Sequence, residues 1–250
     1  MTDQVIIKDD GAIRTIRMNR PDKKNALTAE MYAAMAEAIE TAGGASPIRA
    51  ILIMGVPGAF SAGNDLGDFM KAAMGGEGLG NSVLNFLHAL ARCERPLVAA
   101  VQGVAVGIGT TMMLHCDYAV AASDARFSPP FIALGLVPEA GSSLIAPRLM
   151  GQRRAFELLV MGKPFGGEEA KAAGLVNQVV AADQVEAEAM KAAQTIAALP
   201  PEGVAISRRL MKGEPAEIVK RIDEEATQFK LRLGSPEARE AFQAFFSRKK

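Results

Sequence analysis

Apolar and polar positions alternate along the first part of the chain with two different periods. Short apolar runs at residues 5–8 and 12–18 flank Asp9-Asp10-Gly11, and an Asp-Gly pair between two such runs is typical of a β-hairpin. Apolar residues then recur at helical spacing between Thr28, a candidate N-cap, and Gly43-Gly44. The apolar face of this predicted helix comprises Met31, Met35, Ala38, Ile39 and Ala42.

The alternation of strands and helices continues as far as residue 121. Continuous apolar runs predict strands at residues 48–54, 97–101 and 118–121, and helical patterns are visible at residues 81–92 and 110–115. Strands that alternate with helices favour parallel pairing. We therefore expect an α/β fold with a largely parallel sheet.

From residue 153 onwards helical patterns dominate. They predict helices at residues 153–161, 167–173, 184–199, 203–211, 215–233 and 236–246. The chain becomes wholly helical at Leu199-Pro200-Pro201, so we divide one folding unit into a core of residues 1–199 and a helical region of residues 200–250. The glycine-rich residues 75–80 are expected to form a mobile loop.

Composition and charge narrow the range of partners. The 250 residues are 49% hydrophobic and 22% charged, which is typical of a globular protein. Lys and Arg number 28, as do Asp and Glu, so no overall field attracts nucleic acid or anionic lipid. The chain has no Trp and two Tyr, which argues against base stacking. We expect no nucleic-acid partner.

Membrane segments and metal sites are not expected either. The longest uncharged run, residues 96–115, is too polar and glycine-rich for a membrane span, and the N-terminus lacks the pattern of a signal peptide. Two cysteines and two histidines do not form a zinc motif, so no metal is expected. These features predict a cytoplasmic protein.

The candidate chemistry lies in two glycine-bearing turns. The sequence contains no GxSxG, P-loop, HExxH or GxGxxG motif. Residues 58–66 follow one predicted buried strand and residues 103–109 follow the next. Such turns leave backbone N–H groups free at the start of a helix, and two of them form an oxyanion hole. Alternatively, these glycines serve only to pack strand against helix.

The two turns, about 44 residues apart, resemble those of the crotonase superfamily of enoyl-CoA hydratases and isomerases. The similarity extends over residues 5–200 and includes Asn19-Arg20-Pro21, Asn25-Ala26-Leu27 and residues 121–127, 135–139 and 170–176. It implies a crotonase-like spiral of ββα units with a C-terminal helical trimerisation region. It also implies a homotrimer or dimer of trimers that binds acyl-CoA thioesters and needs no cofactor beyond the coenzyme A of its substrate.

The resemblance also assigns roles to particular residues. The N–H groups of Asn64 and Ile108 correspond to the two donors that stabilise a thioester enolate. The positions of the two hydratase glutamates are occupied by Thr111 and Phe131, which makes hydration through that pair doubtful. Glu139 instead matches the proton-shuttling glutamate of the peroxisomal type of Δ3,Δ2-enoyl-CoA isomerase. Without the resemblance, Glu139 would be interpreted as a surface carboxylate at a helix start.

Substrate contacts are expected along the same segments. The predicted substrate-binding residues are Arg20, Lys24, Ala26, Ser61, Ala62, Gly63, Asp65, Leu66, Gly107, Gly109, Thr111 and Phe131. Among them, Asp65 is expected mainly to cap a helix. The candidates for contact with the phosphates and adenine of coenzyme A are Arg20, Lys23, Lys24, Phe242, Phe246 and, from a neighbouring subunit, Lys249. An apolar stripe of Met211, Ile218, Val219 and Ile222 is expected to face another subunit in part.

Three functions stay open on the sequence. The first is an enoyl-CoA isomerase that uses Glu139. The second is another activity of the superfamily, either an enoyl-CoA hydratase or a thioester hydrolase. The third is a non-catalytic subunit that binds acyl-CoA. Glu139 and the intact pair of turns favour an enzyme.

Overall fold

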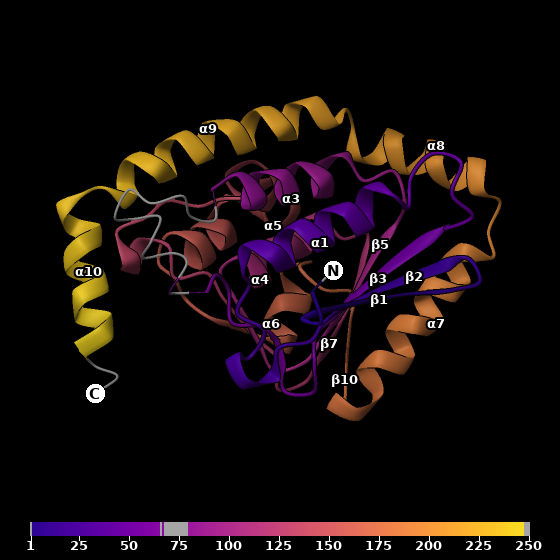
Figure 1. The fold of residues 1–250 in the computed structure, drawn as a ribbon, viewed down its shortest axis with the longest axis horizontal. Helices are drawn as coiled ribbons and strands as arrows, with labels where there is room; N and C mark the ends of the chain where they lie inside the picture. Colours follow the sequence, from indigo (N-terminus) through magenta and orange to yellow (C-terminus); the bar gives the residue numbers. More distant parts are fainter. Residues whose placement is uncertain (1, 66, 68–79, 248–250) are drawn as a thin grey trace.

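The computed structural model describes residues 2–65, 67 and 80–247, and it contains a larger sheet with the strand order β1-β2-β3-β5-β7-β10 (Figure 1). The strands are β1 Val5–Asp10, β2 Ile13–Met18, β3 Ala50–Met54, β5 Leu97–Val101, β7 Tyr118–Ala122 and β10 Gln178–Val180. β1 and β2 form the predicted antiparallel hairpin, with Gly11 at φ 57°, and the other neighbours are parallel. Every residue of β3 and β5 is buried, as expected for central parallel strands.

A smaller sheet has the order β4-β6-β8-β9. Its strands are β4 Ala59–Ser61, β6 Val104–Val106, β8 Arg126–Ser128 and β9 Phe165–Gly166. Consecutive strands divide between the two sheets, because β3, β5 and β7 enter the larger sheet while β4, β6 and β8 follow them into the smaller one. This repetition is the spiral of ββα units that the sequence predicts.

Helices surround the two sheets. They are α1 Ala29–Glu40, α3 Gly80–Arg92, α4 Ile108–Thr111, α5 Ser142–Leu159, α6 Gly167–Ala172, α7 Val185–Ala197, α8 Pro201–Lys212, α9 Pro215–Leu233 and α10 Pro236–Ser247. Short 3-10 helices are η1 Pro21–Lys23, η2 Met112–His115, η3 Ile132–Leu134 and η4 Ala182–Gln184. α7 packs across β3, β5 and β7. The five apolar residues predicted for the buried face of α1 and its C-terminal end are all buried.

The C-terminal helices lie along one edge of the molecule, from α8 through α9 to α10 beside the C-terminus (Figure 1). α9 packs against α3 and α5, and α10 packs against η3. The C-terminal region thus reaches the segments that follow β8, which include Glu139. No helix among the described residues is both long and apolar enough to cross a membrane.

Most predicted elements are confirmed, with ends that differ by a few residues. The helix predicted at 153–161 corresponds to the second part of α5, because Gly151, with φ 77° and ψ 155°, is not helical and separates it from a first part that begins at Ser142. That first part, which contains Pro147, was not predicted. The predicted helix 110–115 is α4 continued as η2. Residues 75–79 of the expected mobile loop lie outside the described residues, and Gly80 begins α3.

Candidate active site

The two glycine turns lie side by side because the strands before them are neighbours. β4 and β6 pair in parallel, so both carboxyl ends lie at the same edge of the smaller sheet. A Cβ atom added to Gly63, which has φ 87°, would lie 3.0 Å from the carbonyl oxygen of Val106. A Cβ atom on Gly109 would lie 3.0 Å from the carbonyl oxygen of Ser61. Glycine is therefore needed for close packing at both turns.

Each turn also leaves one N–H group available. Ile108 is the first residue of α4, where a helical N–H has no acceptor in its own helix. Within the described part of the chain, neither the Ile108 N–H nor the Asn64 N–H has a hydrogen-bond partner. The N–H groups beside them are occupied, since Gly63 donates to Ser61 Oγ at 3.1 Å and Gly107 donates to the Ser128 carbonyl at 3.0 Å. The two turns therefore have both features considered for them: their glycines allow close packing, and the N–H groups of Asn64 and Ile108 are available as donors.

Glu139 is buried next to the second turn. Its side chain accepts a hydrogen bond of 2.7 Å from Thr111 Oγ1, and Thr111 lies one helical turn after Ile108. Only 8% of Glu139 is exposed, so it is not the surface carboxylate of the alternative interpretation. Burial raises the pKa of Glu139 from 4.5 to about 7; the Thr111 hydrogen bond opposes this shift, and the charge of Glu225 adds to it. At neutral pH the carboxyl group therefore exchanges readily between its two protonation states.

Tyr32 is a site residue that the sequence did not reveal. Its side chain is fully buried, and its hydroxyl donates a hydrogen bond to Asn64 Oδ1. Burial, with a smaller effect from the charge of Glu139, raises the pKa of Tyr32 well above its usual value, so the phenol stays protonated. Tyr32 follows Met31 in an amphipathic helix, and this position is equally typical of a core residue.

The loop that contains η1 packs against the first turn. The Ala62 N–H donates to the Lys24 carbonyl at 2.8 Å, and the buried Asn25 side chain donates to the Ala59 carbonyl at 2.9 Å. The main chain at Lys24 and Ala26 therefore lies beside Gly63, whose carbonyl accepts the Leu27 N–H. The side chains of Lys23 and Lys24 are exposed.

Arg20 and Asp65 hold this loop together. Arg20 Nη1 lies 2.6 Å from Asp65 Oδ2 and donates to the Ala26 carbonyl at 2.9 Å. Asp65 Oδ1 accepts the Gly67 N–H at 2.9 Å, in the manner of a helix cap. Two of the predicted site residues, Arg20 and Asp65, thus contact each other. The guanidinium of Arg20 binds Asp65 and the loop carbonyl of Ala26.

The remaining predicted residues lie in different surroundings. Phe131 is buried, whereas Leu66 and Lys249 lie outside the described residues, as does the side chain of Phe246. Phe242 is only 7% exposed and belongs to the apolar core. The proposal that its ring covers an adenine is wrong, because the ring packs inside the protein.

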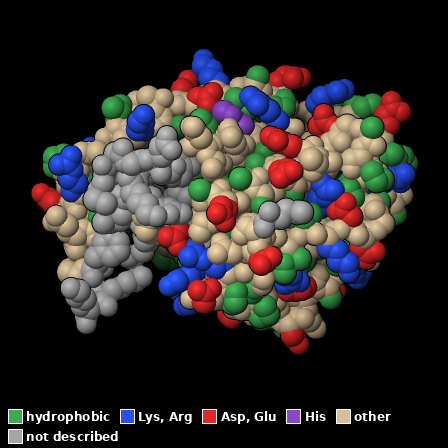
Figure 2. Space-filling model, viewed as in Figure 1, with side chains coloured by type: hydrophobic (Ala, Val, Ile, Leu, Met, Phe, Trp, Pro, Cys, Tyr) green, Lys and Arg blue, Asp and Glu red, His purple; other side chains and the backbone are tan. Residues whose placement is uncertain are grey.

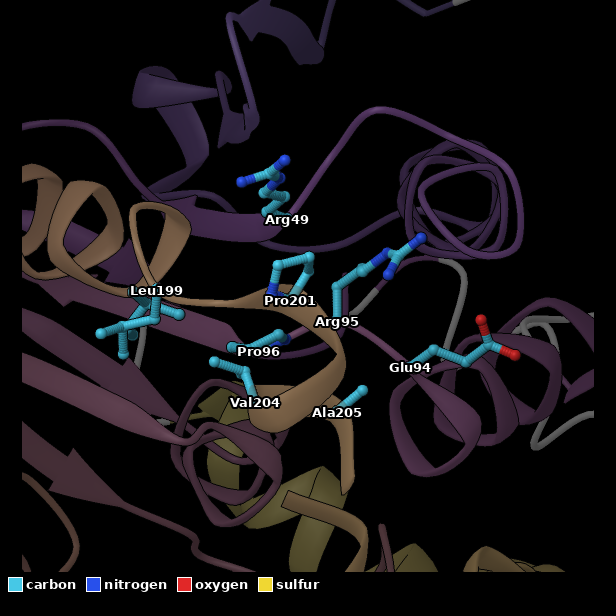
Figure 3. Close-up of a pocket in the computed structure, with 9 residues that line it drawn as sticks. Arg49, Glu94, Arg95, Pro96, Leu199, Pro201, Val204 and Ala205 are labelled. Carbon is cyan, nitrogen blue, oxygen red and sulfur yellow. The ribbon is translucent and has the colours of Figure 1, made fainter. Parts of the chain in front are cut away.

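Two hollows on the surface are separate from this site. Figure 3 shows a cavity between the start of α8 and the segments around Arg49 and Arg95. Its volume is about 10 Å³, which is room for roughly one water molecule. A groove of about 240 Å³ lies between α1 and α3 and is lined by Glu37 and His88 among others. Neither hollow is lined by a predicted site residue.

Comparison with known proteins identifies the family. Residues 8–250 match the family model described as Enoyl-CoA hydratase/isomerase. The chain belongs to the enoyl-CoA hydratase/isomerase family. The crystal structure of an enoyl-CoA hydratase/isomerase from Pseudoalteromonas atlantica T6c superposes with a TM-score of 0.92 and 39% identity, over 98% of both chains. The crotonase fold expected from the motifs is thereby confirmed.

Two curated members of the family illustrate its range. Enoyl-CoA delta isomerase 2 of Rattus norvegicus is 35% identical over 98% of this chain, which spans 64% of the rat protein. The 1,2-epoxyphenylacetyl-CoA isomerase of Escherichia coli K12 is 31% identical over the whole of this chain and 97% of its own length. Both names describe an isomerase of a CoA thioester.

Proposed function

We propose that this member of the enoyl-CoA hydratase/isomerase family shifts the double bond of a 3-enoyl-CoA to give 2-enoyl-CoA, with Glu139 as the proton carrier. The observation that supports it most is the placement of Glu139. This carboxyl group is buried, has a pKa raised to about 7, and is hydrogen-bonded to Thr111 one helical turn from Ile108. A general base with a pKa near the working pH is the most effective one.

The proposed reaction moves one proton and no other atom. The ionised Glu139 removes a proton from C2, and the electrons of the C–H bond move onto the thioester oxygen to form a dienolate. The N–H groups of Asn64 and Ile108 stabilise this oxyanion, and one such donor contributes on the order of 10²–10³-fold in rate. The protonated Glu139 then returns the proton to C4 as the enolate collapses. The double bond now lies between C2 and C3.

The surroundings of Glu139 favour isomerisation over hydration. In the hydratases that the sequence resembles, two carboxylates hold a water molecule, and their positions here are those of Thr111 and Phe131. The Thr111 hydroxyl donates to Glu139, and Phe131 is a buried hydrocarbon ring. A single carboxylate suffices when the proton taken from one carbon is returned to another.

A product assay distinguishes the candidate functions. Purified protein is incubated with 3-enoyl-CoA and 2-enoyl-CoA of several chain lengths. The products are separated by chromatography, and their masses are determined by mass spectrometry. An isomerase converts 3-enoyl-CoA to a product of equal mass. A product heavier by one water from 2-enoyl-CoA alone would indicate a hydratase instead, and free coenzyme A would indicate a hydrolase. Binding without turnover would indicate a non-catalytic subunit.

We further propose that the coenzyme A phosphates contact the loop around η1. Lys23 and Lys24 are exposed there, and the main chain of this loop lies beside the first glycine turn. Arg20 would stabilise the same loop through Asp65. We also propose a homotrimer, alone or as a dimer of trimers. Exposed apolar side chains on α5 and α8, such as Phe156, Leu210 and Met211, support an assembly.

A further inference from the structure

Glu139 is followed by a turn that an L-amino acid disfavours. Ala140 has φ 65° and Gly141 has φ 69°, so two consecutive residues adopt the left-handed conformation. Glycine adopts it freely, whereas alanine does so only when its surroundings hold it there. Ala140 is completely buried. The direction in which Glu139 leaves the main chain therefore depends on what holds this turn.

One hydrogen bond to the turn comes from His115. Its Nε2 lies 2.8 Å from the carbonyl oxygen of Ala140, and since a carbonyl only accepts, Nε2 carries the proton. Burial lowers the pKa of His115 to about 4, so the imidazole is neutral at ordinary pH. His115 thus acts as a fixed donor to this turn.

A local hydrogen bond of 3.1 Å joins the Ser142 N–H to the Glu139 carbonyl, and further hydrogen bonds come from Glu225 on α9, 84 residues after Gly141. Its Oε2 accepts the Gly141 N–H at 2.6 Å, and its Oε1 accepts the Ser143 N–H at 2.9 Å and the Ser143 hydroxyl at 2.5 Å. Glu225 is only 7% exposed. Gly141 offers no side chain to cap α5, and Glu225 supplies the missing acceptor at this helix N-terminus.

We propose that Glu225 and His115 are positioning residues for Glu139, and that α9 thereby completes the active site. This rests on the proposed function in so far as Glu139 carries the proton. Neither residue touches the reacting atoms; each holds one side of the turn at residues 140–141. Without these hydrogen bonds Ala140 relaxes toward right-handed or extended backbone, and the carboxyl group of Glu139 moves away from Thr111 and the two N–H donors.

The test begins with Glu225→Gln. Glutamine has the same shape but only one acceptor oxygen, so at least one of the two main-chain hydrogen bonds is lost. We expect kcat to fall by about tenfold or more, because a small displacement of a catalytic group has an effect of that order, while KM changes by less than about threefold. Hydrogen-exchange mass spectrometry should show faster exchange at residues 139–145.

Two further variants separate positioning from general structural damage. Glu217→Gln removes an exposed ion pair between α9 and Arg148 of α5, so it loosens the same two helices at the surface and should leave kcat unchanged. In Ala140→Gly, residue 140 can adopt the left-handed conformation even without the hydrogen bonds from Glu225 and His115. Glu225→Gln should therefore reduce kcat less in the Ala140→Gly background than in the parental one.

The proposal is overturned if Glu225→Gln keeps the parental kcat, if exchange at residues 139–145 is unchanged, or if Ala140→Gly does not diminish the effect. The exchange measurement needs no turnover. It therefore reports on the hydrogen bonds between Glu225 and the turn even if Glu139→Gln proves fully active. Full activity of Glu139→Gln would refute the proposed function instead.

Discussion

At the scale of single residues, the proposed chemistry depends on the burial of one carboxyl group, that of Glu139. Glu139 could be singled out from the sequence only because residues 135–139 resemble a segment of the crotonase superfamily. Tyr32, His115 and Glu225 could not. Each appears in its own helix as an ordinary core or surface residue, and only contacts across the fold bring it to the site.

Burial of Glu139 has a consequence for stability. Its pKa is about 7 in the folded protein and near 4.5 when unfolded, so between these values the folded state binds more protons. This contribution is fully present below pH 4.5 and is lost as pH rises through 7. Glu139→Gln, neutral at every pH, should be more stable than the parent above pH 8 by on the order of 3 kcal/mol, and at pH 5 by less than about 1 kcal/mol. Thermal unfolding at both pH values measures this, and a pH-independent difference would contradict it.

Thr111 tunes the same carboxyl group. Its hydrogen bond lowers the pKa of Glu139, so Thr111→Val should raise that pKa and move the acid limb of kcat/KM to higher pH. The matched control is Thr110→Val, since the Thr110 hydroxyl donates to the Ala105 carbonyl and not to Glu139. A pH profile of both variants provides the measurement. Equal shifts in the two variants would show that Thr111 has no specific effect on Glu139.

At the scale of elements, long periodic segments were predictable and short ones were not. α1 and α9 follow from apolar spacing over three turns or more, and Thr28 accepts the Met31 N–H as a predicted N-cap should. The strands β4, β6 and β8 have three residues each, too few to show a period. None of the three was predicted as a strand, and β4 and β6 lie within the segments that were interpreted as glycine-bearing turns. The part of α5 before the kink at Gly151 was not predicted, because it contains Pro147, which is unusual inside a helix.

The η1 loop provides a prediction at this scale. Lys23→Ala combined with Lys24→Ala should weaken coenzyme A binding and reduce its dependence on salt, because exposed ammonium groups attract phosphates through a screened field. Lys8→Ala, which removes an exposed charge from β1, should not. Calorimetric titration at two salt concentrations is suitable. Unchanged affinity in the double variant would rule out the loop as the phosphate site.

At the scale of the whole molecule, positive and negative side chains are equal in number. On the face in Figure 2 acidic and basic side chains are interspersed, in keeping with a net charge of zero.

The expected stripe of Met211, Ile218, Val219 and Ile222 is not one surface. Met211 lies in the last turn of α8 and is 87% exposed, whereas Ile222 on α9 is fully buried in the core. The sequence pattern continued across the break at Gly213, where the helix direction changes.

Assembly is the prediction that belongs to this scale. The trimer implied by the resemblance would cover exposed apolar side chains such as Leu210 and Met211. Light scattering on the purified protein at micromolar concentration should give the mass of three or six chains. Leu210→Glu should lower that mass, whereas Lys220→Glu, an exposed change on α9, should not. A monomeric parent would refute the predicted assembly.

The proposed mechanism assigns the proton transfer to a single carboxyl group, and the decisive measurement is the turnover of 3-enoyl-CoA by Glu139→Gln. The substitution preserves size, and its fold and coenzyme A binding serve as controls. We expect turnover to fall by at least about 10²-fold, with a parallel loss of deuterium exchange at C2 and C4, whereas Thr111→Ala should lose far less. Near-parental turnover of Glu139→Gln, together with inactive Thr111→Ala or Asp65→Asn, would contradict the account and assign the proton to another group.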